Sequence, residues 1–342
     1  MKLEFSVIIP VYNAEKFLVD CLNSVERAIK RLPTDVGVEV ICVDDGSTDT
    51  SGSILDTYAV GHKWCRVLHQ KNAGVCFARN KGLEAAGGEW VSFIDNDDFV
   101  EEDYFSSFIA ADYHADVNFF AWERFVGTGE CRINGFADAR YIEDREAIGD
   151  LVFSLIFNRT GENLFGYTWN KFIRRSLIEK YHIRFPELKN FIEYEDEIFA
   201  FKLCQHAQSV AYLPRRLYHY RLGDNNSSRH RIPRHLERSQ VEIEIGDGDD
   251  RPKFKSAAYM QAGMALLMRS YTSPSLRAAL DAARFMKRHQ DYLVPVPNAN
   301  NRLSWLSRQG MMALTFRLFL HGCAYALKRR LQKAPVGGPA EL

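Results

Sequence analysis

Three acidic residues follow an apolar run in the stretch WVSFIDNDDFV, residues 90–100. They are Asp95, Asp97 and Asp98, so three carboxylates lie within four positions. Surface carboxylates after a strand often form turns, which is one interpretation. Like charges gathered at the end of a buried strand also need a compensating cation. Mg²⁺ or Mn²⁺, which prefer oxygen ligands, would supply it and would also hold phosphate oxygens. This spacing therefore indicates a metal and phosphate site.

A second acidic pair, Asp44 and Asp45, opens the stretch DDGSTD after the apolar run VEVICV. A turn followed by a helix N-cap at Ser47 or Thr48 also explains this stretch. This interpretation is compatible with a ligand-binding role for Asp45, because a capped turn would hold its side chain in place.

A third acidic stretch, YEDEIF, contains Glu195, Asp196 and Glu197. Acidic residues at the start of a helix interact favourably with its dipole, which is sufficient reason for Glu195 and Glu197. One carboxylate of such a cluster can also act as a general base.

The elements expected to position these acids alternate between strands and helices. Residues 5–9 (FSVII) and 38–43 (VEVICV) are short β-branched runs typical of strands covered on both faces. Apolar residues recur at helical spacing between them, with Asn13 at the expected N-cap. A helix after DDGSTD, a strand near RVLHQ, a helix over GVCFARNKGLEAA and the strand WVSFI continue the alternation. The pattern predicts an α/β fold with a mostly parallel sheet flanked by helices, whose carboxyl-end rim gathers the acids after each strand.

The pattern after about residue 100 is less regular. We expect YTWNKFIRRSLI (residues 167–178) to be a loop or strand entering a helix, and EYEDEIFAFKLC to be an acidic loop leading into a helix. AYLPRRLYHYRLG is expected to be a strand that ends in a polar turn, while GDNNSSRHRIPR and IGDGDDRPK are the expected mobile segments. Residues 253–332 are predicted to be helical, with a break at VPVPNANN. The predicted domains are 1–230 and a mainly helical C-terminal extension, 231–342.

Composition excludes some classes of protein. Lys plus Arg and Asp plus Glu both number 44, which does not favour a nucleic-acid partner. From residue 251 onward there are 15 basic and 3 acidic residues, leaving 29 and 41 before it, so the two parts carry about +12 and −12 and are expected to meet different partners. The seven cysteines form no CxxC pair, and most of them are expected to be small apolar fillers in a reducing compartment. The N-terminus has no long apolar run with a small-residue cleavage site, so we expect the chain to stay in the cytoplasm.

Four ordered motifs carry a resemblance to a known family: SVIIPVYNAEKFLVDCLNSV, VICVDDGSTDTS, NAGVCFARNKGLEAAGGEWVSFIDNDD, and YTWNKFIRRSLI with YEDEIF. With these motifs, residues 5 to about 230 resemble the family 2 glycosyltransferases of the GT-A fold, in the branch of bacterial polysaccharide biosynthesis. The motifs occur in the order and at the spacing of that family, which makes the set specific.

The resemblance implies a nucleotide-sugar donor site. Its residues are Pro10, Tyr12, Asn13, Glu15, Asp44, Asp45, Arg79, Asp95 and Arg221. Tyr12 would stack on the base, Glu15 would orient its loop or contact the ribose, and Asp45 would accept a hydrogen bond from a uracil N–H. Asp44 would support Asp45. Gly74 would allow the tight entry into the following helix.

The metal in this resemblance is Mn²⁺ or Mg²⁺. Asp97 is the expected ligand, and Asp95 lies nearer the ribose and shares the metal. Arg79 would pair with Asp95 or a phosphate, or else lie on a plain helix surface. Arg221 would fold over the diphosphate, together with His219 unless that side chain is a satisfied core histidine. Asp98 receives no role.

The catalytic residues implied by the resemblance are Glu195 and Asp196. Inversion requires a base that takes the proton of the acceptor hydroxyl, and Asp196 is that base. Nothing marks a nucleophile for a retaining mechanism. On the acceptor side, Trp169 would form a wall for a sugar ring, or else be a core tryptophan.

The C-terminal stretch GMMALTFRLFLHGCAYALKRRLQK is apolar around most of its circumference, and Arg317 interrupts it before it is long enough to span a bilayer comfortably. One interpretation is an interfacial helix at 311–333 in peripheral contact with the inner face of the cell membrane, where the basic cluster Lys328, Arg329, Arg330 and Lys333 meets anionic lipid. The other is a buried helix with a solvated basic tail.

These observations predict an inverting, metal-dependent glycosyltransferase that moves a sugar from a nucleoside-diphosphate donor, UDP foremost, to a hydroxyl of a glycan or lipid-linked saccharide acceptor in capsule, exopolysaccharide or lipopolysaccharide synthesis. A nucleotidyltransferase is an alternative, but IIPVYNAEKF has no glycine-rich phosphate loop. A non-catalytic assembly subunit of a polysaccharide complex is another, and the acids at 45, 95, 97 and 196 argue against it. A processive synthase is disfavoured because the chain has no transmembrane run and no Gln-x-x-Arg-Trp stretch.

Overall fold

The structure, a computed structural model of the chain, describes residues 2–111, 114–125, 132–157, 164–187, 194–221, 235–272 and 275–293, with 314, 315, 317–321, 323 and 324. The chain divides into two compact units, Met1–Pro233 and Arg234–Leu342. The expected mobile segment GDNNSSRHRIPR and the expected break at VPVPNANN lie outside the described residues.

The described strands of the first unit form one 10-stranded sheet. They are β1 (Lys2–Val11), β2 (Val36–Asp44), β3 (Cys65–His69), β4 (Trp90–Phe93), β5 (Phe99–Val100), β6 (Val117–Phe125), β7 (Arg132–Asn134), β8 (Arg140–Ile142), β9 (Lys171–Arg174) and β10 (Val210–Arg221). Their order is β3-β2-β1-β4-β9-β6-β10-β5, with β7 beside β6 and β8 beside β10.

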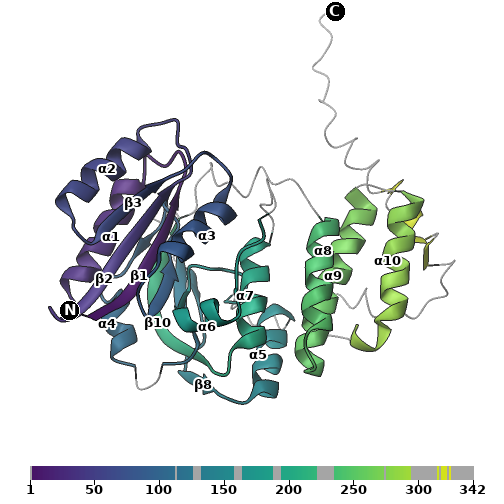
Figure 1. Cartoon of the computed structure of the whole chain (residues 1–342). Helices are drawn as coiled ribbons and strands as arrows, with labels where there is room; N and C mark the ends of the chain where they lie inside the picture. Colours follow the sequence, from purple (N-terminus) through teal and green to yellow (C-terminus); the bar gives the residue numbers. More distant parts are fainter. Residues whose placement is uncertain are drawn as a thin grey trace, which may run out of the picture. The chain divides into compact units, whose positions relative to one another are not determined.

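The half made by β3, β2, β1 and β4 is parallel, as predicted. The helices between its strands are α1 (Leu18–Lys30), α2 (Ser51–Gly61) and α3 (Val75–Ala85). Right-handed crossovers place α1 and α2 on one face of the sheet and α3 on the other (Figure 1). The register aligns Val11 with Asp44, so the loops after β1, β2 and β4 emerge at one rim.

The second half of the sheet is mixed in strand direction. β9 is antiparallel to both β4 and β6, β10 is parallel to β6, and β5 is antiparallel to β10. Parallel neighbours need long crossover connections, usually helical. The sequence supplies regular helical crossovers up to β4, and beyond it the short strands β5, β7, β8 and β9 pair antiparallel. The α/β fold class itself is confirmed.

Four further helices lie in the described part of the first unit: α4 (Tyr104–Ile109), α5 (Arg145–Phe157), α6 (Arg175–Lys180) and α7 (Glu195–His206). An aromatic cluster anchors α4 on the sheet, with the Phe5 ring centroid 5.0 Å from Phe105 and 5.8 Å from Phe172. Burying each such side chain contributes about 1.5–3 kcal/mol. The cysteines at 21, 42, 65, 76 and 204 are buried, which agrees with a role as fillers.

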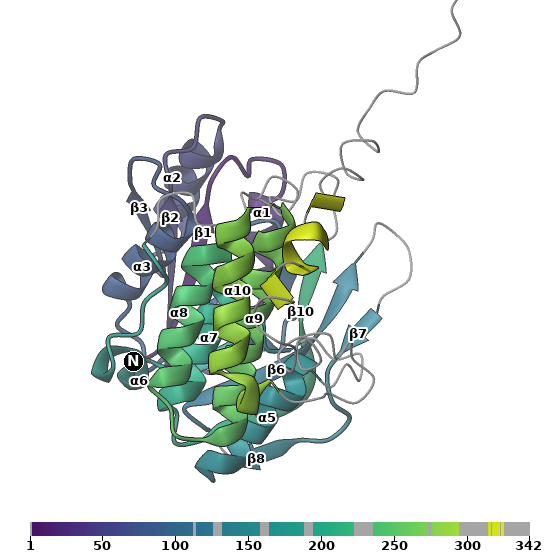
Figure 2. The ribbon, with the colours of Figure 1, turned by 90° about the vertical axis from the view of Figure 1, so that its right-hand side faces the viewer.

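The second unit is helical in its described part, as predicted. It contains α8 (His235–Asp247), α9 (Pro252–Thr272), α10 (Leu276–Arg288) and the short 3-10 helix η2 (Gln290–Tyr292). α9 packs against both α8 and α10 (Figure 2). Within the bundle Arg251 pairs with Asp249 at 2.6 Å, and Arg238 pairs with Glu242 at 2.7 Å.

The C-terminal stretch is described only in part. Residues 314, 315, 317–321, 323 and 324 are helical, with Leu314 and Leu318 buried and Leu320 exposed. The basic cluster at 328–333 lies outside the described residues. Within the described part of the chain, no helix has the length and apolar character needed to cross a membrane.

Candidate active site

The loops that follow β1 and β2 are tied together by side chains at the rim. Asn13 adopts a left-handed backbone (φ 49°), and its Oδ1 accepts hydrogen bonds from the N–H of Thr48 at 2.8 Å and of Asp49 at 3.4 Å. Glu15 Oε2 accepts from Thr50 N at 3.0 Å. Asn13 and Glu15 therefore shape a two-loop platform, and Tyr12 beside them is 49% exposed and free to stack on a flat ligand.

This arrangement overturns two predicted helix caps. α1 begins at Leu18, after Phe17, so Asn13 lies outside the helix and binds the neighbouring loop instead. α2 begins at Ser51, whose N–H is accepted by Asp49 Oδ1 at 2.9 Å, so neither Ser47 nor Thr48 is the cap. The polar side chains that could cap these helices locally form hydrogen bonds with the adjacent loop instead.

Asp45 is almost completely engaged by the chain itself. Its Oδ1 accepts from Gln70 Nε2 at 2.7 Å and Ala73 N at 2.8 Å, and its Oδ2 accepts from Gly74 N at 2.8 Å. Because a carboxylate offers about four lone-pair sites, about one remains for a ligand. Gly74 has φ 108°, a conformation that favours glycine and lets its N–H face Asp45.

Asp44 supports the same turn. Its Oδ1 accepts from Ser47 N at 3.0 Å and its Oδ2 contacts His69 Nδ1 at 2.9 Å. Burial raises the pKa of Asp44, but the hydrogen bonds from Ser47 and His69 outweigh it and hold this pKa below its usual value. Asp44 therefore holds the turn through Ser47 and His69, and its supporting role beside Asp45 in donor binding stays a prediction.

The acidic loop after β4 brings three carboxylates together beside the end of β1. Asn96 Nδ2 donates to the carbonyl oxygen of Pro10 at 2.7 Å, which ties this loop to the donor-side platform. Burial raises the pKa of Asp95 to about 6 and also raises that of Asp97. Burial, together with the charges of Asp97 and Asp95, raises the pKa of Asp98. A neighbouring cation would relieve this crowding.

A metal ion would fit Asp95 and Asp97 only with help from its other ligands. Within the described ranges, no group of three or more His, Cys, Asp or Glu side chains is arranged to hold a metal ion. Mg²⁺ and similar ions are commonly held by one or two carboxylates together with substrate phosphates and water. The two acids, raised in pKa by burial, match that mode of binding.

Arg79 joins the acidic loop to the start of α7. Its Nη1 donates to Asp196 Oδ1 at 2.6 Å and lies 3.6 Å from Glu195 Oε1, while its Nη2 donates to Asp95 Oδ1 at 3.2 Å. The guanidinium is only 4% exposed and lies over the Phe185 ring, 5.3 Å from its centroid. The predicted pairing of Arg79 with Asp95 is confirmed, and the interpretation of Arg79 as a plain surface residue is wrong.

Asp196 is the partly exposed acid of this cluster at the start of α7. α7 begins at Glu195, after Tyr194 in a left-handed conformation (φ 63°), so its first turn directs the positive end of the helix dipole toward these acids. The Asp196 side chain keeps 18% exposure, whereas Glu195 is buried. Of the two predicted catalytic acids, Asp196 is therefore the one that a ligand can reach.

Arg221 and Asp98 meet at the end of β10. Arg221 Nε donates to the Asp97 carbonyl oxygen at 2.8 Å, and its guanidinium lies over the Phe17 ring at 4.6 Å. Asp98, which received no role from the sequence motifs, accepts a hydrogen bond from the Tyr218 hydroxyl and one from the Arg221 backbone N–H. Tyr218 was missed by sequence reasoning because an aromatic residue inside a strand gives no chemical signal.

Trp169 and His219 are both placed in the interior. Trp169 is 2% exposed and stacks on Tyr218 with ring centroids 4.3 Å apart, which favours the core interpretation over a sugar-binding wall. His219 Nε2 lies 2.7 Å from Glu101 Oε1 and its ring stacks on Phe99 at 4.4 Å, so it is a satisfied core histidine.

Lys171 is another residue that the sequence did not single out. It is completely buried, and its Nζ donates to the carbonyl oxygens of Phe165 at 3.2 Å and of Tyr167, and to Asn170 Oδ1 at 2.7 Å. Burial lowers the pKa of Lys171 to about 7. The lysine fastens the turn before β9, which carries Trp169.

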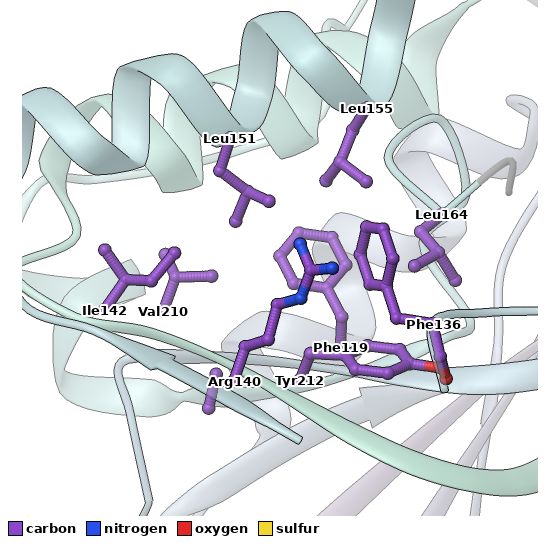
Figure 3. A pocket seen from close by; sticks show the side chains of 10 residues that line it. Phe119, Phe136, Arg140, Ile142, Leu151, Leu155, Leu164, Val210 and Tyr212 are labelled. Atoms are coloured by element: carbon purple, nitrogen blue, oxygen red, sulfur yellow. The ribbon is translucent and has the colours of Figure 1, made fainter. Parts of the chain in front are cut away.

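An apolar cavity lies between β8, β10 and α5 (Figure 3). Leu151, Leu155 and Leu164 line it with Phe119 and Phe136, and the Arg140 guanidinium lies 3.8 Å from the centroid of the Phe136 ring. It contains none of the predicted site residues.

Comparison with known proteins gives a consistent result. Residues 6–182 match the model of the family described as Glycosyl transferase family 2. EpsH of Bacillus subtilis (strain 168), named as a glycosyltransferase, is 35% identical over 221 residues, covering 64% of this chain and 60% of EpsH. EpsJ of the same organism is 31% identical over 229 residues, covering 65% of this chain and 62% of EpsJ. The chain thus spans about three fifths of the length of these relatives.

Solved structures agree on the fold. The crystal structure of S. aureus TarS 1–349 in complex with UDP-GlcNAc has a TM-score of 0.66 and 22% identity, covering 96% of this chain and 92% of that one. At this identity the likeness concerns the fold, and it matches the GT-A architecture expected from the motifs. The family match extends over more than half of the chain and includes the platform loops, Arg79 and the acidic loop. The chain belongs to glycosyl transferase family 2.

Proposed function

We propose that this protein is an inverting, metal-dependent glycosyltransferase that moves a sugar from a UDP-sugar donor to a hydroxyl of a surface glycan acceptor. The observation that carries the proposal is the position of Arg79. One buried guanidinium contacts Asp95, from the predicted donor and metal loop, and Asp196, the predicted base, which lie far apart in the sequence. The donor acids and the base therefore belong to a single site.

The donor is held by the platform and the acidic loop. Tyr12 stacks on the base, Asp45 uses its remaining lone pair to accept from the uracil N–H, and Asp95 and Asp97 face the diphosphate. A bound Mn²⁺ or Mg²⁺ would neutralise the charge that develops on the departing diphosphate. UDP is favoured because TarS, which shares the fold, was solved with UDP-GlcNAc.

The chemical step uses the start of α7. The acceptor oxygen forms a bond to the anomeric carbon as the bond from that carbon to the diphosphate oxygen breaks. Asp196 takes the acceptor proton on Oδ2, while Arg79 holds Oδ1 at 2.6 Å and fixes the direction of the carboxylate. A single displacement of this kind inverts the configuration, and general-base catalysis contributes about 10²–10⁴-fold to the rate.

The acceptor is proposed to be a growing bacterial surface glycan. TarS of Staphylococcus aureus, by its name a poly(ribitol-phosphate) β-N-acetylglucosaminyltransferase, is 28% identical over 239 residues, although the chain covers only 38% of it. Peripheral contact of residues 311–333 with the inner face of the cell membrane would bring a lipid-linked acceptor close. Leu320, 48% exposed, is the described residue that fits this contact.

The test is UDP binding by calorimetry, with and without Mn²⁺. The wild type should bind UDP with Mn²⁺, and Asp97→Asn should lose the metal-dependent part. Asp116→Asn is the matched control, since this acid precedes β6 at the opposite rim, where its Oδ2 accepts from Gln208 N at 2.8 Å. Binding of GDP in place of UDP would change the donor, and failure of every nucleotide with every metal would favour a non-catalytic assembly subunit.

A further inference from the structure

The end of β10 holds the acidic loop through four hydrogen bonds. Tyr218 Oη donates to Asp98 Oδ2 at 2.7 Å and accepts from the Asp95 backbone N–H at 3.1 Å. Arg221 donates from its backbone N–H to Asp98 Oδ1 at 2.7 Å and from Nε to the Asp97 carbonyl oxygen at 2.8 Å. The two candidate metal ligands, Asp95 and Asp97, are therefore both hydrogen-bonded through their backbone to the end of β10.

Asp98 differs from Asp95 and Asp97 in what its oxygens do. It is 1% exposed, and its two oxygens each accept a hydrogen bond from β10. A buried carboxylate is tolerated only when it is hydrogen-bonded in this way. Asp98 is therefore used by the protein itself, which leaves Asp95 and Asp97 for the ligand.

The hydroxyl of Tyr218 is held in position, because an aromatic ring stacks on one face of the tyrosine ring. Tyr218 is completely buried, and its ring lies parallel to Trp169, with an interplanar angle of 10° and centroids 4.3 Å apart. Trp169 in turn stacks on Tyr167 at 4.6 Å, in the turn that Lys171 fastens. The stack thus fixes the position of one oxygen that contacts both ends of the acidic loop.

We propose that Tyr218 and Asp98 are positioning residues that hold Asp95 and Asp97 at the separation required to share a divalent cation with the donor diphosphate. This rests on the proposed function. Groups that orient metal ligands without touching the metal are worth about 10–100-fold in metal affinity. Their effect should therefore appear in the metal dependence of UDP binding.

The experiment uses the full chain and three variants. Tyr218→Phe keeps the stacked ring and removes only the hydroxyl, and Asp98→Asn keeps the shape but replaces one accepting oxygen with a donor. Tyr212→Phe is the matched control: it lies on the same strand, and its hydroxyl donates to the Phe136 carbonyl oxygen at 3.1 Å beside the apolar cavity. All proteins are compared by UDP calorimetry across a Mn²⁺ titration and by hydrogen exchange of peptides spanning residues 94–98.

We expect Tyr218→Phe to raise the Mn²⁺ concentration for half-maximal UDP binding about 10-fold or more, with binding recovered at excess Mn²⁺. Asp98→Asn should move it in the same direction, and Tyr212→Phe should stay within about twofold, as a change remote from the ligands should. Peptides covering Asp95 should exchange faster in Tyr218→Phe than in the wild type or the control. A loss that excess Mn²⁺ does not recover would indicate general loss of structure and overturn the proposal.

The two proposals fail in different ways. If the wild type binds UDP with Mn²⁺ but Tyr218→Phe and Asp98→Asn show the control's metal dependence, the positioning role is wrong and the proposed function stands. If the wild type binds no nucleotide with any metal, the proposed function is wrong. The positioning role toward a shared cation then falls with it, whatever the exchange at Asp95 shows.

Discussion

In the half of the sheet formed by β3, β2, β1 and β4, the acids of the site lie at or just after the carboxyl ends of strands. Asp44 ends β2, and Asp95 lies two residues after the end of β4. In the other half, the site residues come from the start of a helix and the end of a strand, with Asp196 opening α7 and Tyr218 near the end of β10. The side that we propose to bind the donor (the donor side) is therefore built from local sequence, and the side that we propose to hold the base (the catalytic side) from contacts between distant segments.

The largest effects should come from substitutions that impair the donor side and the catalytic side one at a time. Asp196→Asn removes the proposed base but keeps an oxygen for Arg79, so UDP binding should persist while turnover falls about 10²–10⁴-fold. Asp97→Asn should do the reverse and abolish metal-dependent UDP binding itself. The measurements are calorimetry and initial rates with UDP-sugars and lipid-linked acceptors.

Asp116→Asn again serves as the control, and its UDP affinity and turnover should both be near those of the wild type. A variant Asp196→Asn that keeps full turnover would remove Asp196 as the base. If it instead lost UDP binding as completely as Asp97→Asn, the division between the two sides would be wrong.

The second prediction concerns Arg79, whose guanidinium contacts acids on both sides of the site. Arg79→Met would leave Asp95, Glu195 and Asp196 without their shared buried cation, and breaking a buried ion pair costs about 3–5 kcal/mol. Chemical denaturation should show this loss, and both UDP binding and turnover should fall. Arg66→Met is the control, because Arg66 is about half exposed and its pair with Glu39 at 3.2 Å is worth about 0–1 kcal/mol. Equal losses in the two variants would contradict a central position for Arg79.

The donor side could be predicted from the sequence because its signals are local. The apolar strand WVSFI followed by acids, and the pair Asp44 and Asp45 after VEVICV, placed these carboxylates at one rim, where the structure has them. The helix caps failed at Asn13 because its side chain binds the loop at Thr48, a partner that only tertiary structure supplies.

The catalytic side could be predicted only in part. The stretch YEDEIF predicts the acidic start of α7. The contact between this helix start and Arg79 could not be predicted, because it depends on a mixed sheet whose short strands have weak sequence patterns. Trp169 illustrates the limit: an aromatic residue in a polar stretch suits a sugar wall and a core equally, and only burial distinguishes them. The role of Asp98 likewise depended on Tyr218, which lies 120 residues away.

The third prediction concerns pH on the donor side. Burial raises the pKa of Asp95 to about 6, so protonation should compete with Mn²⁺ and weaken metal-dependent UDP binding by up to tenfold per unit as pH falls below about 6. Because the pKa of this acid is raised on folding, its ionisation lowers stability as pH rises from about 4 through 6. Mn²⁺ should therefore raise the Tm more at pH 7.5 than at pH 5. An equal shift at both values, or the same shift in Asp97→Asn, would contradict this.

The smallest effect should come from His69, at the outer edge of the donor side. Its Nδ1 lies 2.9 Å from Asp44 Oδ2 and its Nε2 3.0 Å from Asp56 Oδ1, and the hydrogen bonds that the ring donates to these two acids raise the pKa of His69 although burial lowers it. A raised histidine pKa gives stability that is fully present below about pH 6.5 and is lost as pH rises through the folded-state value.

His69→Gln should therefore lower the Tm slightly at pH 6 and leave it unchanged at pH 8.5. The side chain is 49% exposed, so solvent screening keeps the effect within the range of surface pairs, about 0–1 kcal/mol. Thermal unfolding at the two pH values measures it, with Asp56→Asn as the matched partner variant. An equal loss at both pH values would show that His69 supports Asp44 by packing rather than by charge.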